Sequence, residues 1–156
     1  MKKLYLLRHA DAKPNSTDDI ARQLSKTGHK EAATLANAML HKKISCDVIF
    51  CSSAARACQT CDAVASSVTG EISIQKKEEL YYIDLNKAMK FVKNINESYE
   101  SVLIVSHNPT MSDLATQLTG SEIHFTTGIL KYLELDINSW DDLAPSCGKL
   151  VWSLPN

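Results

Sequence analysis

The feature that most constrains this chain is an apolar run that ends abruptly in an arginine and a histidine, because the pattern recurs. The three runs, with the side chains that follow each within a few residues, are 4–7 with Arg8 and His9, 48–51 with Arg56, and 102–105 with His107. Each run has the length and character of a buried strand. In open α/β sheets, ligands bind beyond the carboxyl ends of the strands. The recurrence therefore predicts a site at one edge of a sheet, suited to chemistry on an anion.

Strand and helix patterns alternate along the sequence, apart from a polar, irregular segment at 11–24. The predicted strands cover about 4–7, 47–51, 72–74, 102–106, 128–136 and 148–154. Apolar residues at helical spacing predict helices within 26–40, 54–68, 88–95 and 109–118, with Ser25 as the N-cap of the first and Pro109 in the first turn of the last. This alternation predicts an α/β fold with three layers, α/β/α, around a mostly parallel central sheet. Because no linker or low-complexity stretch interrupts it, we expect residues 1–156 to form a single domain.

The charge and hydropathy of the chain exclude several classes of partner. The formal net charge of −1 gives no electrostatic reason to expect nucleic acid or an anionic membrane. No apolar run approaches the roughly 20 residues that span a bilayer. The run before Arg8 is also shorter than the about 7–15 apolar residues of a signal peptide core. We therefore expect a cytoplasmic protein that binds neither membrane nor nucleic acid.

The cysteines indicate free thiols in a reducing compartment, because five is an odd number and the composition is that of an ordinary globular protein. Cys58 and Cys61 form a C-x-x-C pair that invites a redox or zinc interpretation. Both residues fall on the apolar stripe of a predicted helix, and no second pair completes a tetrahedral zinc site. We interpret them as packing residues.

The residue types at the predicted sheet edge suit phosphoryl transfer. That reaction needs positive charge around the phosphoryl oxygens and a nucleophile in line with the leaving group. Arginine meets the first need because its planar fork binds two oxygens and keeps its charge. Histidine meets the second because a neutral imidazole carries a free lone pair on one ring nitrogen. Arg8 and His9 supply such a pair at one strand end, with Arg56 as a second clamp and His107 as a further donor.

Four motifs, in order along the chain, resemble those of the histidine phosphatase superfamily and most of all its short, SixA-type phosphohistidine phosphatases. They are Arg8-His9-Ala10, Asp19-x-x-Arg22-x-Leu24-Ser25-x-x-Gly28, Ser52-Ser53-x-x-Arg56-Ala57-x-Gln59-Thr60 and Ser106-His107-Asn108-Pro109. The resemblance extends over nearly the whole chain. It implies a phosphoglycerate-mutase-like fold and transient phosphorylation of His9. The other catalytic residues that it implies, which hold the phosphoryl group, are Arg8, Arg56 and His107.

The same resemblance carries expectations about ligands. It implies that no metal or cofactor takes part, in agreement with the lack of a metal-ligand motif in the sequence. The matched positions make Arg22 and Asn108 candidate substrate-binding residues, although a surface salt bridge would also explain Arg22. The implied substrate is a phosphohistidine on a partner protein. A small phosphoester is the alternative, because short relatives of similar sequence act on such compounds.

The general acid is the least defined part of the predicted site. Larger members of the superfamily carry a carboxylate acid in an inserted segment, and this chain has little room for one. Asp11 and Glu79 are the candidates, with Glu78 beside the latter. Asp11 could equally orient Arg8 or be solvated, and the glutamates fall in a predicted surface loop. A phosphohistidine substrate needs less help from an acid, because imidazole is a far weaker base than an alkoxide.

Two rival interpretations remain at this point. A cysteine phosphatase built on Cys51 and Arg56 is disfavoured, because only four residues intervene, none is glycine, and Cys51 continues an apolar strand. A module that binds phosphate without turnover is disfavoured because both histidines are present. The phosphate-binding loop of the P-loop nucleoside triphosphatases is excluded, because the sequence contains no G-x-x-x-x-G-K-[ST] motif.

Overall fold

The computed structural model describes residues 1–14 and 17–155. Residues 15 and 16, in the polar segment 11–24, and residue 156, at the end of the expected domain, lie outside the described residues. Within these ranges, six strands form one sheet in the order β3-β2-β4-β1-β5-β6. The strands are β1 (Lys2–Arg8), β2 (Val48–Ser52), β3 (Ser73–Lys77), β4 (Ser101–Ser106), β5 (Leu130–Leu135) and β6 (Gly148–Leu154).

The sheet has a parallel half and an antiparallel half. The strands β1, β2, β3 and β4 pair in parallel, whereas β5 is antiparallel to both β1 and β6. The predicted central sheet is confirmed, but it is mixed rather than mostly parallel in its pairing, because β5 runs opposite to both of its neighbours. Arg8 of β1 lies beside Ser106 of β4, and Cys51 of β2 lies beside Val105 of β4. The carboxyl ends of β1, β2 and β4 are therefore level at one edge of the sheet.

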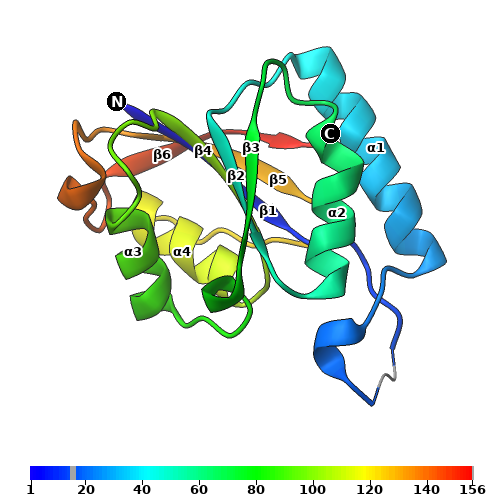
Figure 1. Ribbon diagram of the computed structural model, residues 1–156. Helices are drawn as coiled ribbons and strands as arrows, with labels where there is room; N and C mark the ends of the chain where they lie inside the picture. The colour runs from blue at the N-terminus through cyan, green and yellow to red at the C-terminus, as the bar shows by residue number, and fades with distance from the viewer. Residues whose placement is uncertain (15–16, 156) are drawn as a thin grey trace.

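Helices cover both faces of the sheet and complete the three predicted layers (Figure 1). The helices α1 (Lys26–Lys42) and α2 (Ala55–Ala65) lie on one face, and α3 (Leu85–Lys93) and α4 (Thr110–Thr119) lie on the other. Alternate residues of β1 enter the two cores: Leu4 and Leu6 pack on the α3 and α4 side, whereas Tyr5 and Leu7 pack on the α1 and α2 side. Short 3-10 helices occur at η1 (Asp19–Ala21), η2 (Glu78–Leu80) and η3 (Trp140–Asp142).

The start of α1 holds the loop that follows β1. Ser25 Oγ accepts a hydrogen bond from the Gly28 backbone N–H at 2.9 Å, as predicted for the N-cap. A Cβ atom at position 28 would lie 1.9 Å from the carbonyl oxygen of Asp11, so only glycine fits. This close approach packs the segment just after His9 against the first turn of the helix.

Several predicted boundaries shift by a few residues, and two of these shifts have a clear local cause. The strand predicted at 72–74 runs from 73 to 77 as β3, because an edge strand with mostly exposed side chains carries little apolar alternation. The helix α3 begins at Leu85 instead of 88, because Asp84 Oδ1 caps it by accepting from the Lys87 backbone N–H at 2.8 Å.

The cysteines are all free thiols, as their odd number predicts. Cys61 is buried on α2, and the half-buried Cys58 packs against the same apolar cluster, which supports their interpretation as packing residues. None of the described helices is long and apolar enough to cross a membrane.

Candidate active site

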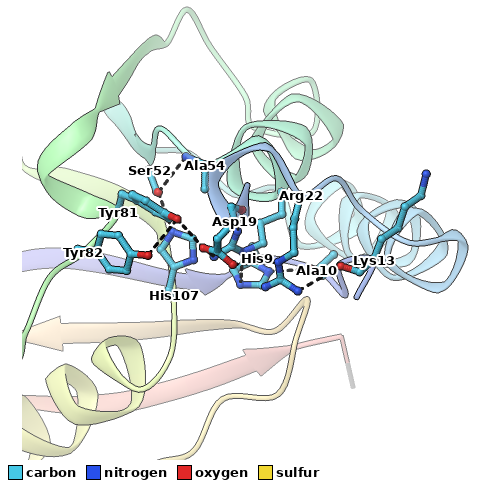
Figure 2. Close-up of polar contacts among 11 residues, drawn as sticks. His9, Ala10, Lys13, Asp19, Arg22, Ser52, Ala54, Tyr81, Tyr82 and His107 are labelled. Carbon is cyan, nitrogen blue, oxygen red and sulfur yellow. Dashed lines mark hydrogen bonds and ion pairs between the residues drawn. The ribbon is translucent and has the colours of Figure 1, made fainter. Parts of the chain in front are cut away.

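The carboxyl ends of β1 and β4 bring two histidines together, and α2 adds an arginine (Figure 2). His9 and His107 are each 8% exposed, and their ring centroids lie 5.0 Å apart. Arg56, in the first turn of α2, places Nε 3.4 Å from Nε2 of His9. Three groups that the sequence places 9, 56 and 107 residues along the chain thus line one small region.

The ring of His9 is held in one orientation. Its Nδ1 lies 2.7 Å from the carbonyl oxygen of Ala10, so Nδ1 carries the proton and donates it. The other nitrogen, Nε2, accepts from Arg56 and therefore bears the free lone pair. Burial, reinforced by the charges of Arg56 and Arg8, lowers the pKa of His9 from 6.5 to about 4. His9 is therefore a neutral imidazole at physiological pH, with Nε2 available as a nucleophile.

The residues that follow Arg56 in its motif fix this arrangement. Thr60 Oγ1 accepts from the Ala10 backbone N–H at 3.0 Å and donates to the Arg56 carbonyl at 2.8 Å. Gln59 Oε1 accepts from the Leu24 backbone N–H at 2.8 Å. The motif Arg56-Ala57-x-Gln59-Thr60 thus ties α2 to the loop that carries His9. Two residues of this motif, Gln59 and Thr60, therefore position the loop, whereas Arg56 supplies the charge.

The ring of His107 has one nitrogen in a hydrogen bond and one, Nδ1, without a partner among the described residues. Its Nε2 lies 2.7 Å from Ser52 Oγ, which also accepts from the Ala54 backbone N–H at 3.3 Å. Burial, followed by the neighbouring His9 and Arg56, lowers the pKa of His107 from 6.5 to about 3. Because Ser52 Oγ already accepts one bond, its hydroxyl proton is free for Nε2, which favours a proton on Nδ1 of His107.

Arg8 Nε and His107 Nδ1 are the buried side-chain polar atoms that have no hydrogen-bond partner within residues 1–14 and 17–155. An unsatisfied buried donor is costly, and native proteins leave few of them. Both atoms belong to the predicted catalytic set. Their natural partner is the oxygen of an anionic ligand.

Asp19, in η1, is the residue of this region to which the sequence analysis gave no role. Its backbone carbonyl accepts from Arg56 Nη1 at 2.8 Å, and its Oδ2 lies 3.2 Å from Arg56 Nη2. Its Oδ1 accepts from Arg22 Nε at 3.0 Å, and the hydroxyl of Tyr81 donates to Oδ2. The Tyr81 hydroxyl, more than the charge of Arg56, holds the pKa of Asp19 below its usual value. Asp19 is thus an ionised anchor for both arginines.

The motif Asp19-x-x-Arg22 contained the signal for Asp19, because a carboxylate and a guanidinium three residues apart can pair within one helical turn. Tyr81 had no comparable signal. It comes from the segment after β3, and the edge of its ring lies over His107 with a centroid distance of 5.7 Å (Figure 2). Only the tertiary fold brings it to the histidines.

Arg8 and Asn108 converge on one backbone oxygen. Arg8 Nη1 donates to the carbonyl of Phe125 at 3.0 Å, and Asn108 Nδ2 donates to the same oxygen at 2.9 Å. Asn108 Oδ1 accepts from the Ser112 hydroxyl at 3.0 Å. Both ends of the Asn108 amide are therefore engaged inside the protein, and its role in substrate binding stays a prediction.

Comparison with known proteins agrees with this geometry. Residues 4–88 match the family model of the histidine phosphatase superfamily, branch 1. The phosphohistidine phosphatase SixA of Escherichia coli is 28% identical over 137 residues, which are 85% of each chain. An uncharacterised protein of Mycobacterium leprae is 34% identical over 121 residues, 74% of this chain and 72% of its own. A solved structure of the protein histidine phosphatase SixA complexed with tungstate superposes with a TM-score of 0.81 at 26% identity, covering 97% of this chain and 95% of its own.

The chain belongs to the histidine phosphatase superfamily.

Its membership confirms the resemblance read from the four motifs, including the SixA-like character and the phosphoglycerate-mutase-like fold. The family model ends at residue 88, before His107, whereas the SixA structure covers almost the whole chain.

The two candidate general acids, Asp11 and Glu79, make their contacts away from the histidines. Asp11 Oδ2 accepts from the Ser25 hydroxyl at 2.6 Å, at the start of α1. Glu79 is exposed on η2 and lines a cavity beside α3. Within the described part of the chain, no hydrogen bond or ion pair joins either carboxylate to His9 or His107. The role of each as an acid stays a prediction.

The geometry disfavours a cysteine phosphatase mechanism with Cys51 as the nucleophile. Cys51 is buried in β2, and its Sγ lies 3.2 Å from the carbonyl oxygen of Ser52. A hydrogen bond with Cys61, together with burial, raises the pKa of the Cys51 thiol well above its usual value. A thiol that stays protonated is a poor nucleophile. Across residues 1–14 and 17–155, no group of three or more His, Cys, Asp or Glu side chains could hold a metal ion.

Proposed function

We propose that this protein removes the phosphoryl group from phosphohistidine on a partner protein, through a covalent phosphohistidine on His9. The observation that carries the proposal is the set of unsatisfied groups around one neutral imidazole. Arg8 Nε and His107 Nδ1 lack partners, and His9 Nε2 keeps its lone pair. The 28% identity to a phosphohistidine phosphatase over most of the chain supports it. So does the tungstate complex of SixA, because tungstate is a tetrahedral oxyanion like phosphate.

In the first step, Nε2 of His9 attacks phosphorus in line with the leaving nitrogen. The new Nε2–P bond forms as the P–N bond of the substrate breaks, and the electron pair of that bond goes to the departing imidazole. Arg8, Arg56 and His107 bind the phosphoryl oxygens and offset their charge. In the second step, water attacks the phosphorus of phospho-His9, releasing orthophosphate and restoring the imidazole.

Arg56 needs to keep its position while it binds the phosphoryl group. The Asp19 carbonyl and carboxylate hold its two terminal nitrogens, and the aromatic ring of Tyr81 lies 5.9 Å from its guanidinium carbon. Its Nε faces His9, and two of its five N–H groups remain for the phosphoryl oxygens. The guanidinium is therefore fixed before substrate arrives, which reduces the ordering that catalysis requires.

The choice of phosphohistidine over alkyl phosphate depends on the leaving group. An alkoxide needs a proton from a positioned acid, an effect of about 10²–10⁴ in rate. An imidazole can be protonated on its free nitrogen before the P–N bond breaks. Of the two candidate acids, Asp11 accepts from Ser25 at the start of α1 and Glu79 lines the cavity beside α3, which supports the substrate that needs no acid.

The test compares catalytic efficiency on a phosphohistidine-bearing protein domain and on a panel of alkyl phosphates. We expect the former to be cleaved with much higher kcat/KM. Equal or better efficiency on an alkyl phosphate would overturn the substrate assignment in favour of a small phosphoester.

The nucleophile is tested separately by two variants. His9→Ala should abolish turnover, by on the order of 10³-fold or more, and should remove the acid-labile phosphate trapped on the wild-type protein. Cys51→Ser is the matched control and should keep most of the activity. Loss of activity in Cys51→Ser, with a thiophosphate intermediate, would show that the cysteine is the nucleophile.

The proposed setting is the cytoplasm. All five cysteines are free, which supports a reducing compartment. We also propose that catalysis needs no metal, because the groups that bind and attack the phosphoryl group in this mechanism are arginine and histidine side chains.

A further inference from the structure

A cavity lies on the α3 face of the sheet, lined in part by residues 79 and 83, which flank Tyr81. Its volume is about 620 Å³, within the range of ligand-binding clefts. Its lining residues include Phe50 of β2, Gln75 and Lys77 of β3, and Lys87, Lys90 and Phe91 of α3. Phe50 and Phe91 meet edge to face with a centroid distance of 5.3 Å and form an apolar wall.

The charge of this cavity is positive although the chain carries a net charge of −1. Three lysines and one carboxylate, that of Glu79, line it. None of the lysines at 77, 87 and 90 has an ion-pair partner in the described part of the chain; Lys77 Nζ instead lies 5.7 Å from the ring centroid of Phe50. A group of unpaired cations around a partly apolar cleft is complementary to a ligand that carries several negative charges.

The strand that borders the cavity favours an extended ligand. β3 is the outermost strand of the sheet and pairs with β2 alone. Its other edge leaves backbone N–H and C=O groups free to pair with an added strand. Gln75 and Lys77 are two residues apart, so both side chains point to the same face, over the cavity. A segment added to this edge would alternate its own side chains in the same way and direct every second one toward α3.

The segment 79–83 separates this cavity from the active site. Glu79 and Ile83 line the cavity, whereas Tyr81, between them, donates to Asp19, the anchor of Arg56. The carbonyl of Leu80 accepts from the Ser106 hydroxyl at 2.8 Å, next to His107. A chain seated in the cavity therefore lies within a few residues' length of a phosphohistidine bound at His9, since an extended residue spans about 3.3 Å.

We propose that an acidic, extended segment of the phosphorylated partner docks along the free edge of β3, with its carboxylates facing the three cavity lysines. This inference rests on the proposed function, and it supplies contacts to the partner beyond the phosphoryl group itself. Small anions and polyanions are the competing occupants. The cavity favours a peptide because it combines its positive charge with an open sheet edge.

The experiment uses the intact protein and two synthetic phosphohistidine peptides of equal length. One has blocks of glutamate on both sides of the phosphohistidine, and the other has glutamine at the same positions. The cavity variant combines Lys77→Gln, Lys87→Gln and Lys90→Gln. The control variant combines Lys76→Gln in β3, Lys93→Gln in α3 and Lys30→Gln in the remote helix α1. It removes the same total charge from residues that do not line the cavity. Phosphohistidine amino acid serves as the small substrate that reports the fold and the basal activity of each variant.

We expect the wild-type kcat/KM to be about tenfold higher for the glutamate peptide than for the glutamine peptide, which is the effect expected of three partly exposed ion pairs. This preference should shrink as the salt concentration rises, because salt screens the ion pairs. The cavity variant should lose the preference while its activity on phosphohistidine amino acid is unchanged, and the control variant should keep it. The unphosphorylated glutamate peptide should bind wild type, as measured by fluorescence anisotropy, and should not bind the cavity variant.

Equal cleavage of the two peptides by wild type would overturn the docking proposal and leave the proposed function standing. So would an unchanged preference in the cavity variant, or binding of inorganic triphosphate to the lysines in place of the peptide. Failure to cleave any phosphohistidine compound, with activity on alkyl phosphates, would instead overturn the proposed function. Peptide binding by anisotropy would still decide the docking proposal in that case.

Discussion

The protonation of His9 allows a quantitative test of the site. Burial is the largest cause that lowers its pKa from 6.5 to about 4, with Arg56 and Arg8 adding to the effect and a hydrogen bond to Ala10 opposing it. The difference between these pKa values corresponds to about 3 kcal/mol in favour of the neutral imidazole. At pH 5, a histidine with a pKa of 6.5 would be about 3% neutral, whereas His9 should be about 90% neutral. The nucleophile should thus stay competent well into the acidic range.

The perturbation is Arg56→Met, which removes the cation that faces His9 Nε2 and keeps an apolar side chain of similar length. The pKa of His9 should rise toward 6.5 without reaching it, because burial remains. Arg22→Gln is the control, since Arg22 is the weakest of the cationic contributions to the pKa of His9. The assay is an NMR titration of the His9 Cε1–H signal in the free protein, assigned by its loss in His9→Gln.

A wild-type titration midpoint near 6.5 would refute the argument, because it would mean that His9 is solvated and not held neutral. The sign of the effect also predicts stability. Between pH 6.5 and about 4, the unfolded chain binds a proton at this histidine and the folded chain does not. His9 alone should therefore lower the free energy of unfolding by about 3 kcal/mol as the pH decreases through this interval, and it contributes no pH dependence above it. His107, with its pKa lowered to about 3, adds to the loss in the same direction, so the comparison of wild type with His9→Gln isolates the share of His9.

Three further predictions concern the acid, the loop after β1 and metal ions. Asp11→Asn and Glu79→Gln should each keep phosphohistidine hydrolysis within about threefold of wild type, and a loss of about 10²-fold or more would identify the acid. Gly28→Ala should cost about 1–3 kcal/mol of stability by thermal denaturation, because its Cβ would lie 1.9 Å from the Asp11 carbonyl oxygen. Activity should survive exhaustive chelation, and its recovery only on addition of zinc or magnesium would contradict the mechanism.

Much of the candidate site was predictable because its residues lie in short, local sequence motifs. An apolar run followed by Arg8 and His9 marks a strand end wherever the strand lies in the sheet. The cap at Ser25 and the glycine at position 28 are equally local, since both act within one helical turn and one close approach. The order of strands and helices also follows from periodicity, and it was sufficient to predict three layers.

The direction of β5 and the contacts of the candidate acids were decided only by the tertiary structure. Periodicity shows that a strand exists but not which way it runs, and β5 reverses beside β1. Asp11 is two residues from His9 in sequence, yet its carboxylate accepts from Ser25 at the start of α1. Nearness along the chain does not fix the direction of a side chain when the backbone turns between the two residues.

The sequence by itself was enough to propose which side chains carry the chemistry; the tertiary structure decided what state those side chains are in. Asp19 holds Arg56 across 37 residues of chain and accepts from Tyr81 across 62, separations that no local period encodes. The neutral state of His9 likewise arises from burial by surrounding elements and from the Arg56 and Arg8 cations, with burial the largest cause. Desolvation and long-range charge depend on the packing of the whole domain, so the identity of a catalytic residue can be predicted locally and its pKa cannot.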